Sequence, residues 1–561
     1  MKEKIQILVF AAFVLLIASL FRYCSGPFYF GNNNDPSYFY FYNFLCILEG
    51  KSLPFVDHPG TTLDMLGALV VKMFFSSSQN TPWLLANALR SEEVLGLVWF
   101  LMIVMYVATV VVLGFYVFKK LQDRVFTGLV LLSSLWLIGV RSFSGQGILP
   151  ISANVNSDTM MMTAVNLMLL AIFRFYFSPK THACSQAISL GTAVAFALAT
   201  KFTALPFFVV AWVILETWQQ RILLTAVVAG GFIVLTCPLW SSYSHMITWC
   251  KGLIFHQGFH GSGGEGFDRT AFVRGFVWVI KTHWFFAGAW FFAGMVALNR
   301  RPSVDSKIRR VLSAVALGGL AQMIIVAKQP SYQYMAPMIG ISSLVPAFLY
   351  KAFPHWWRRG FKYAMGFILA VSLGSIAVGM WQVNEKKQKT KEMLETIAKD
   401  YAQCRVCPFY RSSTPGFSFV FWNRVIESEE YSSILKSLYP DLVYYDIFGR
   451  DFKDSAGQVV SLGQLKRQKS QVLIYGSDRD PQSFEPYLTI KKIYTHGDES
   501  LYEVISGRSN RGMEFFQYAM VMFAQGRDEE AFKAAVISQQ LGVGQDISGF
   551  IELLSHKILR H

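Results

Sequence analysis

The chain has 561 residues, of which 53% are hydrophobic and only 16% are charged. Because a soluble domain carries about 25% charged residues, this composition excludes an ordinary soluble protein and indicates an integral membrane protein. The formal net charge is +15, but residues 385–561 hold 23 Lys and Arg against 23 Asp and Glu. The positive excess therefore lies in residues 1–384, where it indicates membrane topology and not a nucleic-acid surface.

Apolar runs recur along residues 1–384. The first, from Ile5 to Leu20, is followed by no small-residue cleavage site, so we interpret it as a retained helix and not as a signal peptide. A membrane span needs about 20 mostly apolar residues. We expect eleven spans, near residues 5–21, 94–118, 125–141, 158–176, 184–200, 203–219, 222–240, 284–299, 311–327, 335–352 and 363–382.

The Lys and Arg residues indicate the orientation of these spans. If the N-terminus is cytoplasmic, the inner connections hold 17 of the 28 Lys and Arg of residues 1–384, although the outer connections are far longer. Short loops rich in Lys and Arg stay on the cytoplasmic side. We therefore expect residues 22–93, residues 239–283 and the whole C-terminal part to face outward. A span at Leu63–Phe75 would invert every later connection, against this charge distribution.

The first outer segment, residues 22–93, contains two apolar stretches that are too short to span, Tyr38–Leu48 and Leu63–Phe75. They are typical of helices that lie in the membrane interface. Asp35 precedes the first of them. A partly desolvated carboxylate has a raised pKa and is a better proton acceptor. Asp35 and Pro36 are also consistent with a simple helix start, since Asp favours the N-cap and Pro the first position, and the two interpretations are compatible.

The motif "DHPGTT" at residues 57–62 links these two stretches. Pro-Gly makes a tight turn. This turn either aims Asp57 and His58 into a cavity or only connects two interfacial helices.

Several cationic or aromatic residues fall at the expected outer ends of spans. Lys201 follows "FALAT", and a charge at bilayer depth is a functional candidate that needs a partner. The alternative is a lysine that extends to the interface. Arg141, Lys328 and Tyr334 occupy similar positions, where plain interfacial anchors are also common.

The outer loop "HMITWCKGLIFHQGFHGSGGEGFDR" holds several polar side chains. His256 and His260 are four residues apart, so one helix face would carry both and would permit metal ligation. The ligand set is incomplete, however, and "GSGGEG" lacks the Lys-Ser/Thr of a phosphate-binding loop. We therefore predict no metal site here.

The composition changes after Trp381, where a charged helix leaves the bilayer. Residues 385–506 are expected to form a mixed α/β domain, with strands at "SQVLIYGSD", "LTIKKIYT" and "SLYEVI". Residues 507–561 have the periodicity of a helical hairpin, like a single helical repeat. Cys404 and Cys407 would form either a disulfide or two unpaired thiols, and Cys24 and Cys46 form a second possible pair.

Four stretches of residues 1–382 carry a family resemblance. They are "NDPSYFYFYNFLCILEGKSLPFVDHPGTTLDMLGAL", "NVNSDTMMMTAVNLMLL", "ALATKFTALP" and "AKQPSYQYMAPM". Together with the expected topology, they resemble the C-type glycosyltransferase (GT-C) superfamily. The most similar branch is that of the bacterial family-39-like enzymes, which are related to protein O-mannosyltransferases and the lipid A aminoarabinose transferase. The implied fold is a polytopic all-α membrane bundle over residues 1–384 with an extracytoplasmic C-terminal part.

The resemblance also implies a function. A hexosyl or pentosyl group would move, with inversion, from a polyprenyl phosphate to an extracytoplasmic lipid, glycan or protein. Asp35 would be the catalytic base. The family often has a second acidic residue beside it, where this chain has Pro36, so Asp57 and Asp158 are candidates for that second acid. The residues that bind the donor's phosphate would be Lys201, Arg141, Lys328 and Tyr334. The residues of the loop that receives the acceptor would be His58, His256 and His260.

No cofactor is required by this interpretation, although a divalent metal is compatible with it. The expected location is the bacterial inner membrane, with a cytoplasmic N-terminus and a C-terminal domain outside. A nucleic-acid partner is not expected. Two alternatives stay open. One is a transporter or flippase of lipid-linked sugars, which usually shows internal repeats that this chain lacks. The other is a non-catalytic scaffold for envelope assembly.

Overall fold

The computed structural model describes most of the chain. It covers residues 2–30, 37–56, 58–75, 90–138, 140–141, 148–149, 151–178, 182–257, 265–299, 305–353, 357–409, 414–425, 432–446, 450–477, 488–507, 516, 518–520, 522–523, 527–540 and 546–558. The chain forms two compact units, Met1–Gln388 and Lys389–His561. We call them the membrane unit and the C-terminal unit. Asp35, Asp57 and His260 lie outside the described residues.

Long apolar helices dominate the membrane unit. Within the described ranges, eight segments are long and apolar enough to cross a membrane. They are α1 (Lys2–Ser25), α5 (Ser91–Leu121), α7 (Ser157–Phe177), α8 (Ala183–Thr200), α10 (Trp218–Leu235), α14 (Ser306–Lys328), the stretch Gln333–Ala352 and α17 (Trp357–Asp400). The stretch Gln333–Ala352 consists of η7 (Gln333–Met335), α15 (Ala336–Ile341) and α16 (Leu344–Ala352). The chain is therefore a multi-pass membrane protein.

Three further apolar helices coincide with predicted spans but are shorter than the eight. They are α6 (Arg124–Ile138), α9 (Leu205–Ile214) with the preceding turn η4 (Phe202–Ala204), and α13 (Trp284–Leu298). The sequence explains where α9 ends. Thr217 caps the following helix, α10, and its side chain accepts a hydrogen bond from the backbone N–H of Gln220, whose own side chain completes a capping box. The predicted span at 203–219 is thus interrupted by a helix start.

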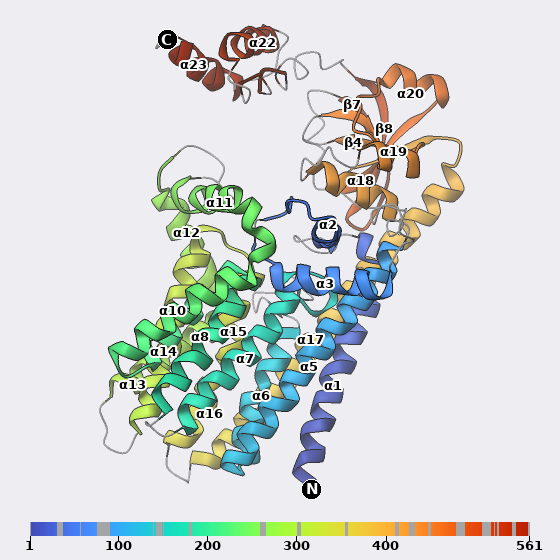
Figure 1. Cartoon of the computed structure of the whole chain (residues 1–561). Coiled ribbons are helices and arrows are strands. Elements are labelled where there is room, and N and C mark those ends of the chain that lie inside the picture. The colour runs from blue at the N-terminus through green and yellow to red at the C-terminus, as the bar shows by residue number, and fades with distance from the viewer. Residues whose placement is uncertain are drawn as a thin grey trace. The chain divides into compact units, whose positions relative to one another are not determined.

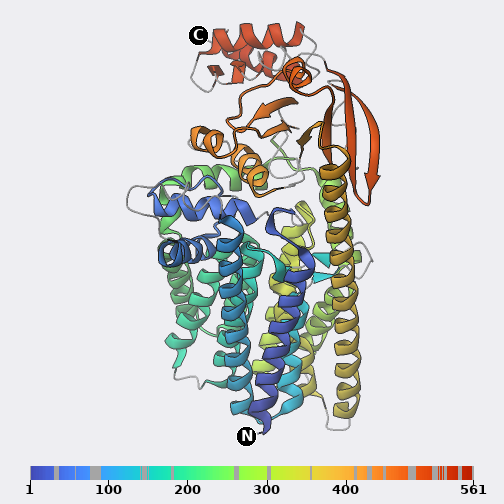
Figure 2. The same cartoon turned by 90° about the vertical axis from the view of Figure 1, so that its right-hand side faces the viewer.

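Hydrogen bonds join helix ends that are far apart in sequence, and they define two ends of the bundle. At one end, Arg124 pairs with Glu3, and Lys307 Nζ donates to the carbonyls of Tyr176 and Ser178 at 3.1 and 2.9 Å. We call this the Lys307 end. Successive spans run in alternate directions between this end and the opposite one (Figures 1 and 2).

The opposite end carries the two short helices that follow α1, and we call it the α3 end. Here α2 (Ser37–Leu48) and α3 (Thr61–Phe74) lie across the ends of the long helices (Figure 1). Gly60 begins α3 in a left-handed conformation with φ of +63°, which a glycine adopts at no steric cost. Its N–H bonds the carbonyl of Thr200 at 3.2 Å, so the "HPG" turn joins the end of α8.

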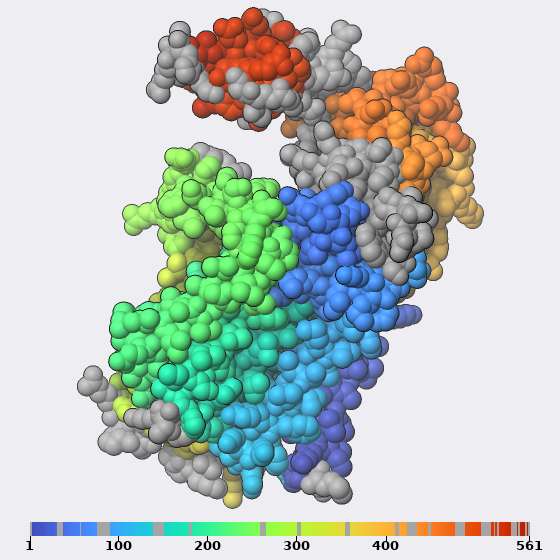
Figure 3. Space-filling view, in the orientation of Figure 1, coloured from blue at the N-terminus to red at the C-terminus, as the bar shows by residue number. Residues whose placement is uncertain are grey.

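Smaller elements complete the α3 end. They are η1 (Phe28–Phe30), β1 (Val140–Arg141), β2 (Ile148–Leu149), η2 (Ile151–Ala153), η5 (Cys237–Ser242), α11 (Tyr243–Phe255) and α12 (Arg269–Thr282). Strands β1 and β2 pair antiparallel. In the space-filling view, the green region that contains η5 and α11 abuts the blue region that contains α2, α3 and the loop between them (Figure 3). A hydrogen bond of 3.2 Å from Ser242 Oγ to the carbonyl of Leu53 fixes this contact.

The C-terminal unit contains a four-stranded sheet in the order β3-β6-β8-β7. The strands are β3 (Arg405–Pro408), β6 (Val472–Ser477), β7 (Leu488–His496) and β8 (Glu499–Gly507), and only the β3–β6 pair is parallel. The other elements are the strand pair β4 (Val443–Asp446) and β5 (Asp451–Asp454) and the helices α18 (Pro415–Val425), α19 (Ser432–Leu438), α20 (Leu462–Gln468), α22 (Asp528–Gln540) and α23 (Asp546–Ile558).

None of the seven cysteines forms a disulfide. Cys404 packs with Leu473 and Tyr475, whereas Cys407 packs with Ile474 and Phe409. Because alternate residues of a strand face opposite sides of the sheet, the two thiols lie on opposite faces. Of the two alternatives at "CRVC", the structure has two thiols and no disulfide, and no disulfide joins Cys24 to Cys46.

Candidate functional site

A buried ion pair lies at the α3 end. Asp158 is in the first turn of α7, whose N-cap Asn156 accepts from the N–H of Thr159 at 3.1 Å. Lys201 ends α8 in an extended conformation, which turns its side chain out of the helix direction. Its Nζ lies 2.9 Å from Asp158 Oδ2, and the side chains are 0% and 2% exposed. Sequence analysis named both residues, but for different roles.

Tyr334 connects this pair to a neighbouring pocket. Lys201 Nζ lies 5.0 Å from the centroid of the Tyr334 ring, within the range of a cation–π contact. On the other side, the Tyr334 ring meets the His58 ring edge-on at 6.2 Å between centroids. His58 also meets Trp249 of α11 at 5.9 Å. One aromatic residue thus contacts both a buried ammonium and the pocket wall.

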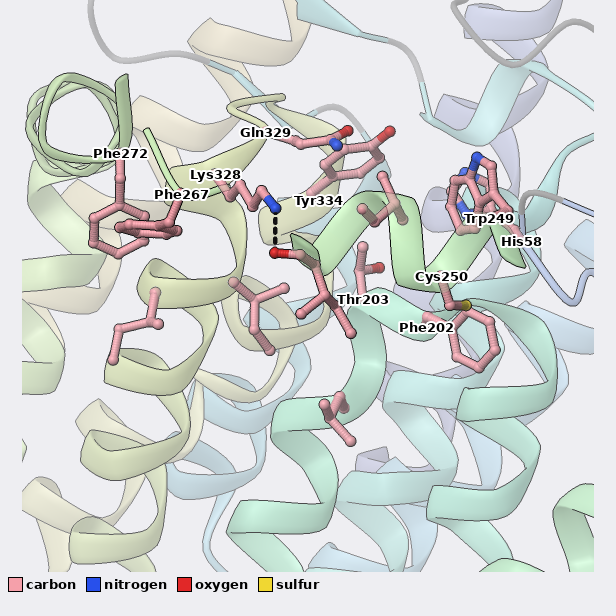
Figure 4. A pocket seen from close by; sticks show the side chains of 15 residues that line it. His58, Phe202, Thr203, Trp249, Cys250, Phe267, Phe272, Lys328, Gln329 and Tyr334 are labelled. Carbon is pink, nitrogen blue, oxygen red and sulfur yellow. Dashed lines mark hydrogen bonds between the residues drawn. The ribbon is translucent and has the colours of Figure 1, made fainter. Parts of the chain in front are cut away.

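The pocket has a volume of about 480 Å³. It lies among α11, α12, α14, η4 and the loop before α3 (Figure 4). Its walls are mainly apolar, with contributions from Phe202, Trp249, Leu253, Phe267, Phe272 and Ile324. The polar groups are few, and they include His58, Lys328, Gln329 and Tyr334. Such a lining suits an amphiphilic ligand, whose apolar body needs a wall and whose head needs few polar contacts.

Lys328 supplies a positive charge to this pocket. It is the last residue of α14, and its Nζ donates to the carbonyl of Ile254 at 2.5 Å (Figure 4). A carbonyl is a neutral partner, and no carboxylate of the described residues lies within ion-pair distance of Lys328. The charge of Lys328 is therefore available to an anion, whereas the charge of Lys201 is balanced by Asp158.

Gln329, which sequence analysis did not name, lies next to Lys328 and also lines the pocket. Its Nε2 is buried and has no hydrogen-bond partner within the described part of the chain. A buried amide without a partner costs free energy unless a ligand or water satisfies it. The only signal in the sequence was its place beside Lys328 in "KQP".

A buried carboxyl also escaped the sequence analysis. Asp64, in α3, is fully buried, and its Oδ2 accepts from Asn43 Nδ2 of α2 at 3.1 Å. Desolvation raises the pKa of Asp64 well above its usual value of 3.8, and the bond from Asn43 offsets this only in part. Asn43 also bonds the backbone of Phe55 in both directions, at 2.8 and 3.3 Å. The pair therefore holds the loop that leads to His58.

The remaining predicted residues have different outcomes. Helix α11 ends at Phe255, and His256 is extended and pairs as a β-bridge with Glu265. The prediction that one helix face carries His256 and His260 is therefore wrong, because the helix stops before His256. Within the described ranges, no three His, Cys, Asp or Glu side chains gather as metal ligands do. Arg141 lies in β1, and only its backbone is described.

No family model, curated protein or solved structure matches this chain. The function must therefore be inferred from the site itself and from the resemblance seen in the sequence.

Proposed function

We propose that this protein is a membrane glycosyltransferase of the GT-C type that takes a sugar from a polyprenyl phosphate. The observation that carries the proposal is the pocket at the α3 end, where mainly apolar walls surround the ammonium of Lys328. An apolar chain with a single anionic head has the complementary chemistry. The resemblance in residues 1–382 favours a polyprenyl phosphate among the amphiphiles of this kind.

The proposed division of roles differs from that expected from the sequence. Lys328 and Gln329 would donate to the donor's phosphate, and charge-assisted hydrogen bonds of this kind stabilise the negative charge that builds on a leaving group. Lys201 would act on Tyr334 and keep its ring at the pocket wall, since its charge is already balanced by Asp158. A direct contact of Lys201 or Arg141 with phosphate stays a prediction.

The proposed reaction is a single displacement. A hydroxyl oxygen or amine nitrogen of the acceptor attacks the anomeric carbon from the face opposite the phosphate. The bond between that carbon and the phosphate oxygen breaks, and its electron pair stays on the polyprenyl phosphate. The proton of the acceptor passes to a carboxylate, for which Asp35 is the candidate. The products are the inverted glycoside and free polyprenyl phosphate.

The proposed topology has eleven spans, made of the eight long segments together with α6, η4–α9 and α13. The Lys307 end would be cytoplasmic because it gathers Lys and Arg. The α3 end and the C-terminal unit would then face outward, where sugar nucleotides are absent and a lipid-linked donor is needed. A bacterial inner membrane fits this arrangement.

A binding measurement tests the role of Lys328. The full chain in lipid nanodiscs is titrated with undecaprenyl phosphate and with undecaprenol, which lacks the phosphate. Lys328→Met should weaken undecaprenyl phosphate binding about tenfold to a hundredfold, since a hydrogen bond to a charged group contributes about 1.5–3 kcal/mol. Undecaprenol binding should not change. Lys281→Met is the matched control, because Lys281 is an exposed lysine of α12 outside the pocket. Equal binding by the two variants would contradict this role.

A transfer assay tests the enzyme itself. The purified protein is mixed with undecaprenyl-phosphate-linked hexoses and pentoses and with envelope extract as the source of acceptor, and released undecaprenyl phosphate is measured by mass spectrometry. The proposal predicts release with at least one donor and loss of release in Asp35→Asn. Release that persists in a well-folded Asp35→Asn variant would remove the proposed base. Movement of the intact lipid-linked sugar across the membrane without release would favour a flippase.

A further inference from the structure

A second pocket, of about 410 Å³, lies at the Lys307 end. Its walls come from the C-terminal ends of α5, α7 and α16, the loop before α10 and the start of α14. The charged residues that line it are Lys120, Glu216, Asp305, Lys307 and Lys351, and the aromatic ones are Tyr176 and Phe177. The pocket at the α3 end shares none of these residues.

The two acidic groups of this pocket are already satisfied. Asp305 caps α14, and its Oδ1 accepts from the N–H of Lys307 at 2.8 Å. Glu216 lies 3.5 Å from Arg310 Nη1 in an ion pair. Both carboxylates thus have partners of their own, and the three lysines of the lining outnumber them.

The lysines, in contrast, have only neutral partners, or none, among the residues that the structure describes. Lys307 Nζ donates to two backbone carbonyls at the end of α7. Lys351 Nζ lies 5.0 Å from the centroid of the Tyr176 ring. Among the described residues, no carboxylate pairs with Lys120, Lys307 or Lys351. The sequence that continues from these walls, residues 179–181 and 300–304, contains no Asp or Glu.

We infer that this pocket binds a phosphate group, and that its source is the headgroup of an anionic phospholipid. Three lysines that pair with no carboxylate of the described residues line one hollow, against two carboxylates that have partners of their own. The hollow lies at the helix ends, where the headgroups of a bilayer are found. Basic pockets between membrane helices are typical sites for anionic headgroups. Lysines that only extend to the membrane interface would not need to line the same pocket.

This inference is independent of the proposed function, because it concerns the other end of the bundle. The test uses native mass spectrometry of the full chain in detergent with phosphatidylglycerol or phosphatidylcholine. Lys120→Gln with Lys351→Gln removes two lysines of the pocket. Lys119→Gln with Lys362→Gln removes the same charge from two exposed lysines outside the pocket and serves as the control.

We expect phosphatidylglycerol adducts on the wild type and the control, and about thirtyfold weaker binding by the pocket variant. Phosphatidylcholine should bind more weakly and should not distinguish the variants. If glycerol 3-phosphate displaces phosphatidylglycerol, the phosphate site stands but a soluble phosphate is its source. Should the pocket variant fail to fold, Lys351→Gln against Lys362→Gln gives the same comparison with about a fivefold effect. Equal phosphatidylglycerol binding by pocket and control variants overturns the inference.

Discussion

Lys201 and Asp158 are 43 residues apart in the chain, yet Lys201 Nζ and Asp158 Oδ2 lie 2.9 Å apart in a pair that excludes solvent. The pair ties the end of α8 to the first turn of α7 and places an ammonium beside the Tyr334 ring. Removing one charge from such a pair leaves the other buried without its partner, which costs far more than the pair itself contributes.

The single replacement should therefore destabilise the protein far more than the double replacement. Lys201→Met alone should lower the free energy of unfolding by about 3–5 kcal/mol, because Asp158 stays charged and buried. Lys201→Met combined with Asp158→Leu should recover most of that loss. Thermal unfolding followed by Trp fluorescence gives the comparison. If the double variant is at least as unstable as the single one, the two side chains do not depend on each other.

Asp64 predicts a dependence of stability on pH. Its pKa is raised in the folded state, so folding favours the protonated carboxyl. The stability that this group contributes is fully present below its unfolded pKa and is lost as the pH rises through the folded pKa. Asp64→Asn, which keeps an acceptor for Asn43, should remove this loss. Near pH 4 the melting temperatures of the variant and the wild type should agree to within about a degree. Near pH 8 the melting temperature of the variant should be the higher one.

The exposed Asp268 provides the control for that measurement, since Asp268→Asn keeps a good N-cap for α12. Its melting temperature should follow the wild type at every pH. A constant loss of stability in Asp64→Asn, equal at low and high pH, would mean that folding does not change the pKa of Asp64, and it would contradict this prediction.

Because α12 packs closely against α14, replacing a glycine by alanine should affect stability very differently at Gly275 and at Gly288. A Cβ on Gly275 would lie 1.9 Å from the carbonyl oxygen of Ala327, whereas a Cβ on Gly288 of α13 would meet nothing within 4 Å. Gly275→Ala should destabilise the protein by about 1–3 kcal/mol, because backbone cannot move aside cheaply. Gly288→Ala should be neutral or slightly stabilising, since alanine favours helix. Equal melting temperatures would contradict the close contact.

Two exposed cysteines test the orientation. Cys237 is the first residue of η5 at the α3 end, and Cys184 is the second residue of α8 at the Lys307 end. A membrane-impermeant maleimide added to intact cells should label the wild type and Cys184→Ser equally. It should label Cys237→Ser less, because the removed thiol faces outward. After permeabilisation, Cys184→Ser should lose label relative to the wild type. The reverse pattern would place the Lys307 end outside.

Hydrophobic patterning predicted the membrane segments of this chain well. The run of apolar residues in α5 and the charged continuation of α17 to Asp400 can both be read from the sequence, as can strands β6, β7 and β8. Length and composition determine such elements because a span must satisfy its own backbone within the bilayer. The prediction was less accurate at α9, where the capping box at Thr217 ends the apolar run early.

The contacts of the candidate site could not be predicted from the sequence. Lys201 needed a partner, but nothing in the spacing of 43 residues indicated that Asp158 was that partner. The pocket joins the loop of His58 with α11 and α14, which are distant in the chain, and such contacts depend on tertiary packing. Lys328 was named as one of several candidates, and its place in the pocket wall and its neutral partner, the carbonyl of Ile254, distinguish it from Lys201, which pairs with Asp158.

The most direct test of the account is a cryo-EM structure of the full chain in nanodiscs with undecaprenyl phosphate added. We predict density for the phosphate within hydrogen-bond distance of Lys328 Nζ and Gln329 Nε2, with the polyprenyl chain along the apolar walls and the Lys201–Asp158 pair intact. Density for the phosphate away from this pocket, or a pocket that holds only ordinary phospholipid in the presence of the probe, would contradict the proposed donor site.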